Sequence, residues 1–172
     1  LYCSRVCCMY AIKQAELLKE RVPDVEAMIF YMDIRAFGKG FEEFYQRSEK
    51  EFGIKFIKGR VAEIIEDPNT KNLTLVAENM ETGDLVREEV DLVVLSTGLM
   101  PAASRDVLKT MQIPTGDDGF FVSLHPKVDP VTTALPGVFL AGVAEGPKDI
   151  PDSVTQASAA AMRASIVLKG AA

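Results

Sequence analysis

The sequence lacks any long hydrophobic run: none of its apolar stretches approaches the ~20 residues that a membrane-spanning helix requires. No segment near its start reads as a signal peptide or transit sequence. Basic residues are not in excess, because 19 lysines and arginines stand against 25 aspartates and glutamates, and the net charge of -6 argues against an electrostatic nucleic-acid binder. We therefore expect a soluble globular chain and, since its first residue is not methionine, a piece of something longer.

Cysteine is scarce, and its distribution excludes one class of protein. The three cysteines, Cys3, Cys7 and Cys8, all fall within the first eight residues. A secreted disulfide scaffold would spread an even number of cysteines along the chain, and the adjacent Cys7 and Cys8 pair only with strain. Three close thiolates suit a metal or an iron-sulfur cluster, although a four-iron cluster normally takes four. The alternative is three reduced thiols at a strand-to-helix junction.

A complete G-x-G-x-x-G fingerprint for dinucleotide binding is also missing. Gly38 and Gly40 begin such a pattern after an expected strand and before an expected helix, but Glu43 stands where the third glycine belongs. A flexible helix entry explains the two glycines better. Asp33 and Arg35 at the same strand end resemble neither an NAD-binding acid nor a phosphate-binding cluster for NADP.

The pattern of apolar residues predicts an α/β fold whose character changes along the chain. Alternation of strand, helix and strand up to residue 57 indicates a crossover and a parallel sheet, and turn signals after it predict an antiparallel meander. The chain then divides into two unequal portions, with a seam near Gly98. Strands are expected at 25–32, 54–57, 61–65, 73–77, 85–90, 91–96 (fully buried) and 137–140, and helices at 9–20, 41–52, 104–111 and 154–168.

The end of the sequence has the pattern of a flavin site. The strand at 137–140 stops at Gly142, and a glycine there lets the backbone approach a flat ring closely. The following helix start would aim N–H groups and partial positive charge at electron-rich carbonyls, with Pro151, Asp152 and Ser153 supplying its N-terminal chemistry. The same local pattern also fits a plain helix that covers a sheet, and both interpretations stay open.

Four separated segments, in the same order, resemble the HdrA family, which is the flavin subunit of heterodisulfide reductase in methanogens and has relatives in anaerobic bacteria. They are residues 3–15, 33–40, 96–99 and 146–153. Together they extend the resemblance through nearly the whole chain, and their order is far more specific than a single glycine motif.

The resemblance implies a Rossmann-like parallel sheet with an antiparallel meander, as a fragment of a thioredoxin-reductase-like flavoprotein with two dinucleotide-binding domains. Residues 1–97 would form the rear part of the NAD(P)-binding-like domain, and residues 98–172 the C-terminal segment of the FAD-binding domain. The family holds FAD and 4Fe-4S clusters. Its N-terminal FAD fingerprint, upstream cysteine and ferredoxin-like segments are missing from this sequence, so we expect the fragment alone to be inactive and to hold FAD weakly.

The resemblance also implies roles for individual residues. Cys3, Cys7 and Cys8 match three of the four thiolates of a 4Fe-4S cluster. Lys13 matches a lysine near the flavin N5, where its ammonium would act in catalysis; without the resemblance it is an exposed helix lysine that pairs with Glu16. His125 and Lys127 are expected at the pyrimidine edge of the flavin, although a histidine beside a proline is commonly a surface residue. The remaining expected flavin contacts are Gly98, Gly142, Val143, Ile150, Pro151, Asp152, Ser153, Val154 and Gln156.

Two classes of function follow. In the first, the chain belongs to a cytoplasmic FAD-dependent electron-transfer subunit that passes electrons to iron-sulfur clusters and, as in methanogens, splits electron pairs. Its implied partners are the other heterodisulfide reductase subunits, a hydrogenase or formate dehydrogenase that supplies electrons, and ferredoxin. In the second, the fragment is a partner-docking module with no cofactor of its own. A subunit of a related membrane-linked sulfate-reduction complex is a further alternative.

Overall fold

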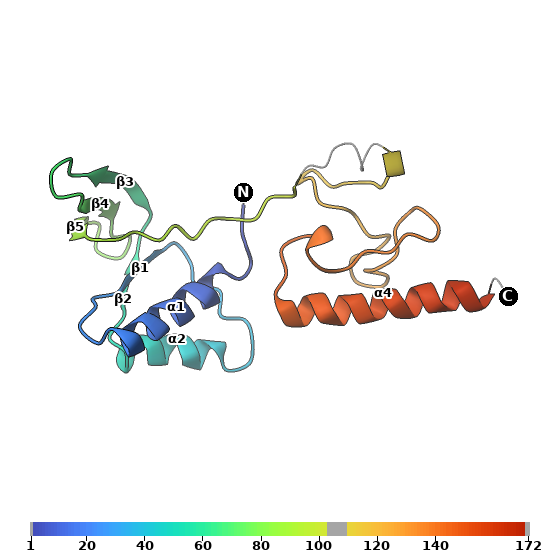
Figure 1. Cartoon of the computed structure of the whole chain (residues 1–172), viewed down its shortest axis with the longest axis horizontal. Coiled ribbons are helices and arrows are strands. Elements are labelled where there is room, and N and C mark those ends of the chain that lie inside the picture. Colours follow the sequence, from blue (N-terminus) through green and yellow to red (C-terminus); the bar gives the residue numbers. More distant parts are fainter. Residues whose placement is uncertain (1, 103–109, 171–172) are drawn as a thin grey trace. The chain divides into compact units, whose positions relative to one another are not determined.

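The computed structural model describes residues 2–102 and 110–170. The elements run in chain order as α1 (Cys7–Arg21), β1 (Met28–Tyr31), α2 (Phe41–Lys50), β2 (Lys55–Lys58), β3 (Val61–Glu66), β4 (Leu73–Glu78), β5 (Leu85–Val90), the 3-10 helix η1 (Gly142–Ala144) and α4 (Ile150–Gly170) (Figure 1).

The chain forms two compact units. One contains Cys7–Ser96, and the other combines Leu1–Val6 with Thr97–Ala172. The first residues of the chain therefore pack with its C-terminal part, although the sequence grouped them with residues up to 97. The division into two compact units does not tell which unit binds which dinucleotide. The NAD(P)-binding-like and FAD-binding roles of the two portions therefore stay predictions.

In the unit Cys7–Ser96, the expected strand, helix and strand follow helix α1. β1 pairs in parallel with β2, from Met28 opposite Lys55 to Tyr31 opposite Lys58, and α2 lies between them in the sequence. Helix α1 packs against α2, and the fully buried side chains Ile12, Ser48 and Ile54 form the centre of this core. The Ser48 hydroxyl donates to the buried Glu16 carboxylate at 2.6 Å, so α1 and α2 are joined by a polar contact as well as by apolar packing.

The antiparallel meander is confirmed in the order β3, β4, β5. Strand β4 lies in the middle and contributes buried apolar side chains, including Leu75 and Ala77. Its two turns are built locally: the Asp67 carboxylate accepts from the amide of Asn69, and the Asn79 side chain accepts from the amide of Glu81. Such side-chain-to-backbone bonds stabilise turns without help from distant parts of the chain, which is why the sequence predicted them.

The buried strand expected at 91–96 is wrong. No strand is assigned there, and the side chains of Leu92, Val94 and Leu95 are 75%, 71% and 69% exposed. An apolar run becomes a buried strand only where other strands pair with it and other elements cover its faces. In the described part of the chain the parallel sheet consists of β1 and β2 alone, which leaves this run uncovered.

Two further expectations in the C-terminal unit need correction. Instead of a strand at 137–140 there is an isolated bridge between Thr132 and Phe139, because the chain turns at Gly137 and leaves too little length for a ladder. Helix α4 starts at Ile150 rather than at 154. The helix expected at 104–111 lies largely outside the described residues, of which only 110 and 111 belong to it.

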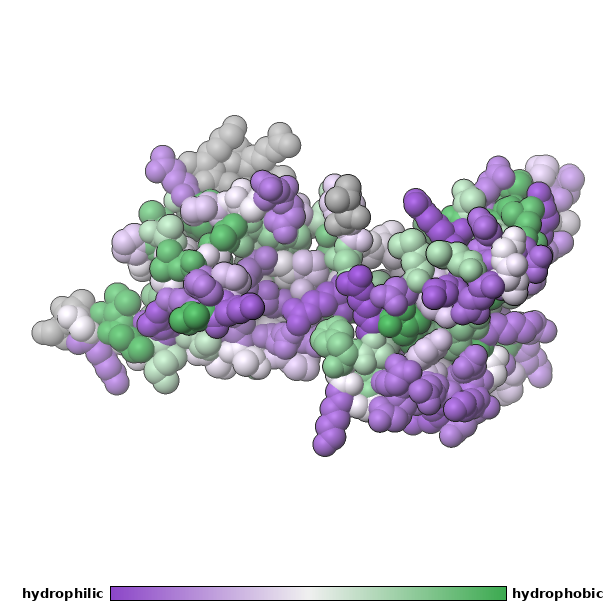
Figure 2. Space-filling model, turned by 180° about the vertical axis from the view of Figure 1, so that it is seen from behind, coloured by the Kyte–Doolittle hydropathy of each residue, from purple (hydrophilic) through white to green (hydrophobic). Residues whose placement is uncertain are grey.

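The C-terminal unit is held by a small core under loops rather than by a sheet. Within the part of the unit that the structure describes, its buried apolar residues are Ile113, Phe120, Val131 and Leu140. Glycine is required at position 98 by close approach, because a Cβ there would lie 2.8 Å from the Cβ of Tyr2. On the face shown in Figure 2, hydrophobic residues lie at the surface among hydrophilic ones. Among the described residues, no helix has both the length and the apolar character to span a membrane.

Candidate functional site

The candidate site is the turn at Gly142 together with the first turns of helix α4. Leu140 is buried, Ala141 is extended, and Gly142 takes a left-handed φ of 65° at the start of η1. A Cβ on Gly142 would lie 3.6 Å from Ser153, which is an ordinary contact. The backbone conformation, and not lack of space, is therefore what favours glycine here.

Helix α4 is capped by Asp149, a residue that the sequence analysis did not select. The Asp149 carboxylate accepts from the amide of Asp152 at 2.7 Å, and its carbonyl accepts from the amide of Ser153 at 3.0 Å. The expectation that Asp152 and Ser153 cap the helix is wrong, because the helix begins one turn earlier than predicted. The Ser153 hydroxyl instead donates back to the Asp149 carbonyl at 2.7 Å.

Gln156 joins the glycine turn to the helix. It is the one buried side chain in α4, at 8% exposure. Its Oε1 accepts from the amide of Gly142 at 2.8 Å, and its Nε2 donates to the Pro130 carbonyl at 3.1 Å and to Glu145 Oε2 at 2.5 Å. Both amide atoms are therefore engaged, and the Gly142 amide already has an acceptor.

Glu145 is the centre of this polar cluster. Besides Gln156, it accepts from the Ser123 hydroxyl at 2.8 Å and from Lys148 Nζ at 3.0 Å. The side chains of Glu145 and Lys148 are only 18% and 14% exposed. Desolvation by itself raises the pKa of Glu145, but the hydrogen bonds from Lys148, Gln156 and Ser123 outweigh it and hold the pKa below its ordinary value. Glu145 is thus an ionised carboxylate at neutral pH.

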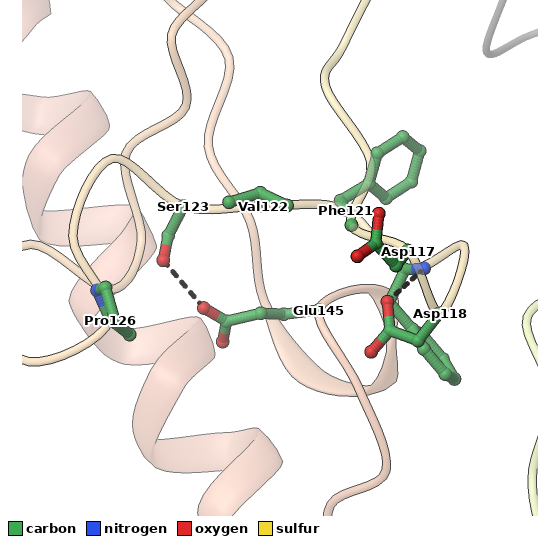
Figure 3. A pocket seen from close by; sticks show the side chains of 9 residues that line it. Asp117, Asp118, Phe121, Val122, Ser123, Pro126 and Glu145 are labelled. Atoms are coloured by element: carbon green, nitrogen blue, oxygen red, sulfur yellow. Dashed lines mark hydrogen bonds between the residues drawn. The ribbon is translucent and has the colours of Figure 1, made fainter. Parts of the chain in front are cut away.

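An open pocket of about 400 Å³ lies beside this cluster (Figure 3). Ser123 and Glu145 meet at its wall through their hydrogen bond, and Phe121 and Val122 add apolar surface. Asp118 lines the pocket too, but its carboxylate accepts from the amide of Phe120 and so stabilises its own turn.

The turn and the helix start present mainly apolar groups to a ligand. The amides of Gly142, Asp152 and Ser153 all have acceptors within the protein. The side chains of Val143, Ile150 and Val154 are exposed. Gly142, Asp152 and Ser153 therefore do not offer the unpaired N–H groups that the sequence led us to expect. What the turn and the helix start offer is exposed apolar side chains beside a glycine, which fit the face or edge of a flat ring.

The cysteine segment reaches the same helix end through Arg5. The Arg5 guanidinium forms an ion pair with Asp152 at 2.6 Å, and the Arg5 amide donates to Cys3 Sγ at 3.2 Å. Cys3 lies in the C-terminal unit, whereas Cys7 and Cys8 belong to the other one. All three are reduced thiols. Within residues 2–102 and 110–170, no three metal-binding side chains are gathered closely enough to hold an ion.

The other predicted site residues belong to other segments of the chain. Lys13 is exposed on α1 in the unit Cys7–Ser96. It does not pair with Glu16, whose carboxylate instead contacts Ser48 and Arg47. Gly98 packs against Tyr2.

His125 and Lys127 are exposed in a loop of the C-terminal unit. His125 Nδ1 accepts from the amides of Lys127 and Val128 at 3.2 Å, so one ring nitrogen stabilises the loop itself. Sequence reasoning missed Glu145 and Lys148, although two opposite charges three residues apart, directly after the glycine turn, were a signal that could have found them.

Comparison with known proteins places the chain among redox proteins. A family model described as pyridine nucleotide-disulphide oxidoreductase matches residues 5–161. The chain is 57% identical over 168 residues to an iron-sulfur subunit, HdrA, of the CoB–CoM heterodisulfide reductase of Methanopyrus kandleri, covering 97% of the chain and 26% of that protein. It is 54% identical over 171 residues to the corresponding subunit of the H(2):CoB-CoM heterodisulfide,ferredoxin reductase of Methanothermobacter marburgensis, covering 98% and 26%. The chain thus spans about a quarter of the length of these relatives.

Two of the solved structures with a similar fold are thioredoxin reductases. The enzyme from Lactococcus lactis superposes with a TM-score of 0.66 at 25% identity, over 90% of this chain and 48% of that one. The enzyme from T. acidophilum gives a TM-score of 0.64 at 21% identity, over 91% and 47%. The α/β fold with a parallel sheet and a meander is therefore that of a fragment of a thioredoxin-reductase-like protein.

Proposed function

The chain belongs to the pyridine nucleotide-disulphide oxidoreductase family, as a portion of the HdrA subunit of heterodisulfide reductase, and from this premise we propose that its C-terminal unit supplies one side of an FAD site in an electron-transfer subunit. The observation that carries the proposal is the turn at Gly142, tied to the start of α4 and bordered by the exposed side chains of Val143, Ile150 and Val154. FAD, when bound, accepts and passes on electrons.

The chain's own residues supply position and charge in this proposal. Gly142 keeps the turn free of a side chain, and the three apolar side chains exclude water from the ring. The positive end of α4 faces two carboxylates of its own, Asp149 and Asp152, of which Asp152 is neutralised by Arg5. Arg5 therefore preserves part of the helix-end potential that favours negative charge on a bound flavin. His125 and Lys127 remain proposed contacts of the pyrimidine edge, and Lys13 remains the proposed group at N5.

The three cysteines are proposed as ligands of a 4Fe-4S cluster whose fourth thiolate comes from elsewhere in a longer protein. The residue types suit such a cluster, because three reduced thiols lie within six residues of sequence and iron-sulfur clusters are held by thiolates, although the described residues do not gather three such side chains at one point. We assign residues 1–97 to the rear of an NAD(P)-binding-like domain and residues 98–172 to an FAD-binding domain. We further propose a cytoplasmic complex that contains other heterodisulfide reductase subunits, an electron-input hydrogenase or formate dehydrogenase, and ferredoxin.

The test is FAD content and flavin reduction potential of the full-length subunit that carries this chain. Gly142→Val adds a β-branched side chain where φ is 65°, so we expect loss of FAD or a shifted potential. Gly170→Ala, at the far end of the same helix, has no neighbour within 4 Å and is the matched control. Full FAD content and an unchanged potential in Gly142→Val would refute the proposed site.

A second candidate function is supported by the exposed side chains of Leu92, Val94 and Leu95. A contiguous apolar run of this kind marks a surface that another protein segment covers. It favours a docking module without a cofactor of its own. A well-folded, colourless full-length subunit that still binds its partners would support this function over the flavin site.

A further inference from the structure

We propose that Gln156 and Glu145 are positioning residues that hold the Gly142 turn in the conformation that receives the flavin, without touching the flavin themselves. This inference rests on the proposed flavin site. It assigns a role to the buried cluster of Gln156, Glu145, Lys148 and Ser123.

The orientation of the Gln156 amide has one acceptable solution. Its oxygen faces a donor, the Gly142 amide, and its nitrogen faces two acceptors, the Pro130 carbonyl and the Glu145 carboxylate. A flipped amide would place N–H against N–H and oxygen against two oxygens, and a buried polar group without a partner is costly. These three hydrogen bonds fix the orientation of the Gln156 side chain, and one of them is to the backbone of Gly142.

Glu145 holds the Gln156 amide in this orientation. Its carboxylate oxygens face the Ser123 hydroxyl on one side and Lys148 Nζ with Gln156 Nε2 on the other. An ionised carboxylate is an acceptor only, so it matches three donors. The cluster therefore orients Gln156 from a point outside helix α4, three residues after the glycine turn.

The hydrogen bond between Gln156 and the Gly142 amide affects the proposed flavin contact surface by holding the backbone of the turn in place. The side chain of Gln156, in the second turn of α4, bonds the Gly142 amide and so forms a bridge between this part of the helix and the glycine turn across fourteen residues of sequence. Val143 lies on the turn and Val154 on the helix, so the spacing between these two exposed side chains depends on that bridge. If the bridge is lost, the Gly142 amide loses its acceptor and the turn is free to move.

The experiment uses the full-length subunit with four variants: Gln156→Leu, Glu145→Gln, the double exchange Gln156→Glu with Glu145→Gln, and Ser158→Ala. FAD dissociation constant, visible flavin spectrum and reduction potential are measured for each. Gln156→Leu leaves the Gly142 amide without its acceptor, and Glu145→Gln removes the charge that strengthens the three hydrogen bonds to position 145. We expect each of these two single variants to weaken FAD binding roughly tenfold and to alter the spectrum. Ser158 is exposed and bonds within its own helix, so Ser158→Ala should match the parent.

The double exchange separates positioning from general destabilisation. It keeps the total charge, returns an acceptor to the Gly142 amide and restores a donor–acceptor pair between positions 145 and 156, but it sets a carboxylate oxygen against the Pro130 carbonyl. Relative to Gln156→Leu, we therefore expect it to recover only part of the FAD affinity and of the parent spectrum. If Gln156→Leu does not fold, Glu145→Gln and the double exchange decide the matter. Parent-like spectrum and affinity in the single variants, with Gly142→Val still defective, would overturn the positioning role while leaving the flavin site intact. A parent-like Gly142→Val would instead count against the site.

Discussion

Acidification is expected to weaken the C-terminal unit through Glu145. The hydrogen bonds of this carboxylate hold its pKa below 4.5 in the folded protein. A group whose folded pKa is depressed stabilises the fold fully above its unfolded pKa, and that contribution is lost as the pH falls through the folded pKa. Stability derived from Glu145 should therefore be constant near neutral pH and decline below pH 4.5.

The size of the effect follows from burial and partners. An exposed ion pair contributes about 0–1 kcal/mol, but Glu145 and Lys148 are 18% and 14% exposed, and two further donors reach the same carboxylate. A hydrogen bond to a charged group contributes about 1.5–3 kcal/mol. Glu145→Gln removes the charge from the group that accepts from Lys148, Gln156 and Ser123, so it abolishes the ion pair and weakens all three hydrogen bonds. We expect it to lower the free energy of unfolding by about 2 kcal/mol at neutral pH.

Urea unfolding of the 172-residue chain, followed by circular dichroism from pH 7 to pH 3, measures this difference. The gap between the parent and Glu145→Gln should close as the pH falls below 4.5, because the parent then protonates the same group. The pKa values of Asp67 and Asp129 are also lowered, but both proteins carry them, so they cancel in the comparison. A gap that stays constant through the acid range would refute the reasoning, as would a gap near zero at pH 7.

Three further results are expected. In urea unfolding, Ser48→Ala should destabilise the unit Cys7–Ser96 by about 1.5–3 kcal/mol, because it leaves the buried Glu16 carboxylate without its hydroxyl donor. Arg47→Ala should cost only about 0–1 kcal/mol, because the Arg47 side chain is 48% exposed, and equal losses in the two variants would be inconsistent with this structure. Iodoacetamide should label exposed Cys3 faster than half-buried Cys7 and Cys8 when modification is followed by mass spectrometry, and preferential labelling of Cys8 would contradict that order. The isolated chain should bind FAD weakly in calorimetry, because it contains no complete glycine fingerprint for the pyrophosphate; isolation with one tightly bound FAD per chain would contradict this.

Local signals in the sequence were sufficient for much of the unit Cys7–Ser96. Asp67 and Asn79 build their turns with their own side chains, and Gly53 takes a left-handed φ of 64° where α2 has ended. Turn signals of this kind, combined with the pattern of apolar residues between them, were enough to predict the meander and the parallel strand pair. These features depend on neighbours within a few residues, which is why they could be predicted.

The run at 91–96 shows where local signals fail. Its composition is that of a buried strand, but Leu92 is 75% exposed because nothing in the described residues pairs with it. Burial is a property of the surroundings and not of the run itself. The same limit explains the shift of the α4 start to Ile150, where the cap at Asp149 depends on how the preceding loop is folded.

The sequence by itself determined the family resemblance, the α/β class, the glycine turn and the helix after it, because each rests on residue types in a fixed order. Only the tertiary structure decided that Gln156 turns inward to the Gly142 amide, that Glu145 collects donors from Ser123 and Lys148, and that Arg5 reaches Asp152. Arg5 and Asp152 are 147 residues apart in the chain. Hydrogen bonds and ion pairs form between atoms a few ångströms apart, and that proximity comes from the folded path of the backbone, which residue spacing does not reveal.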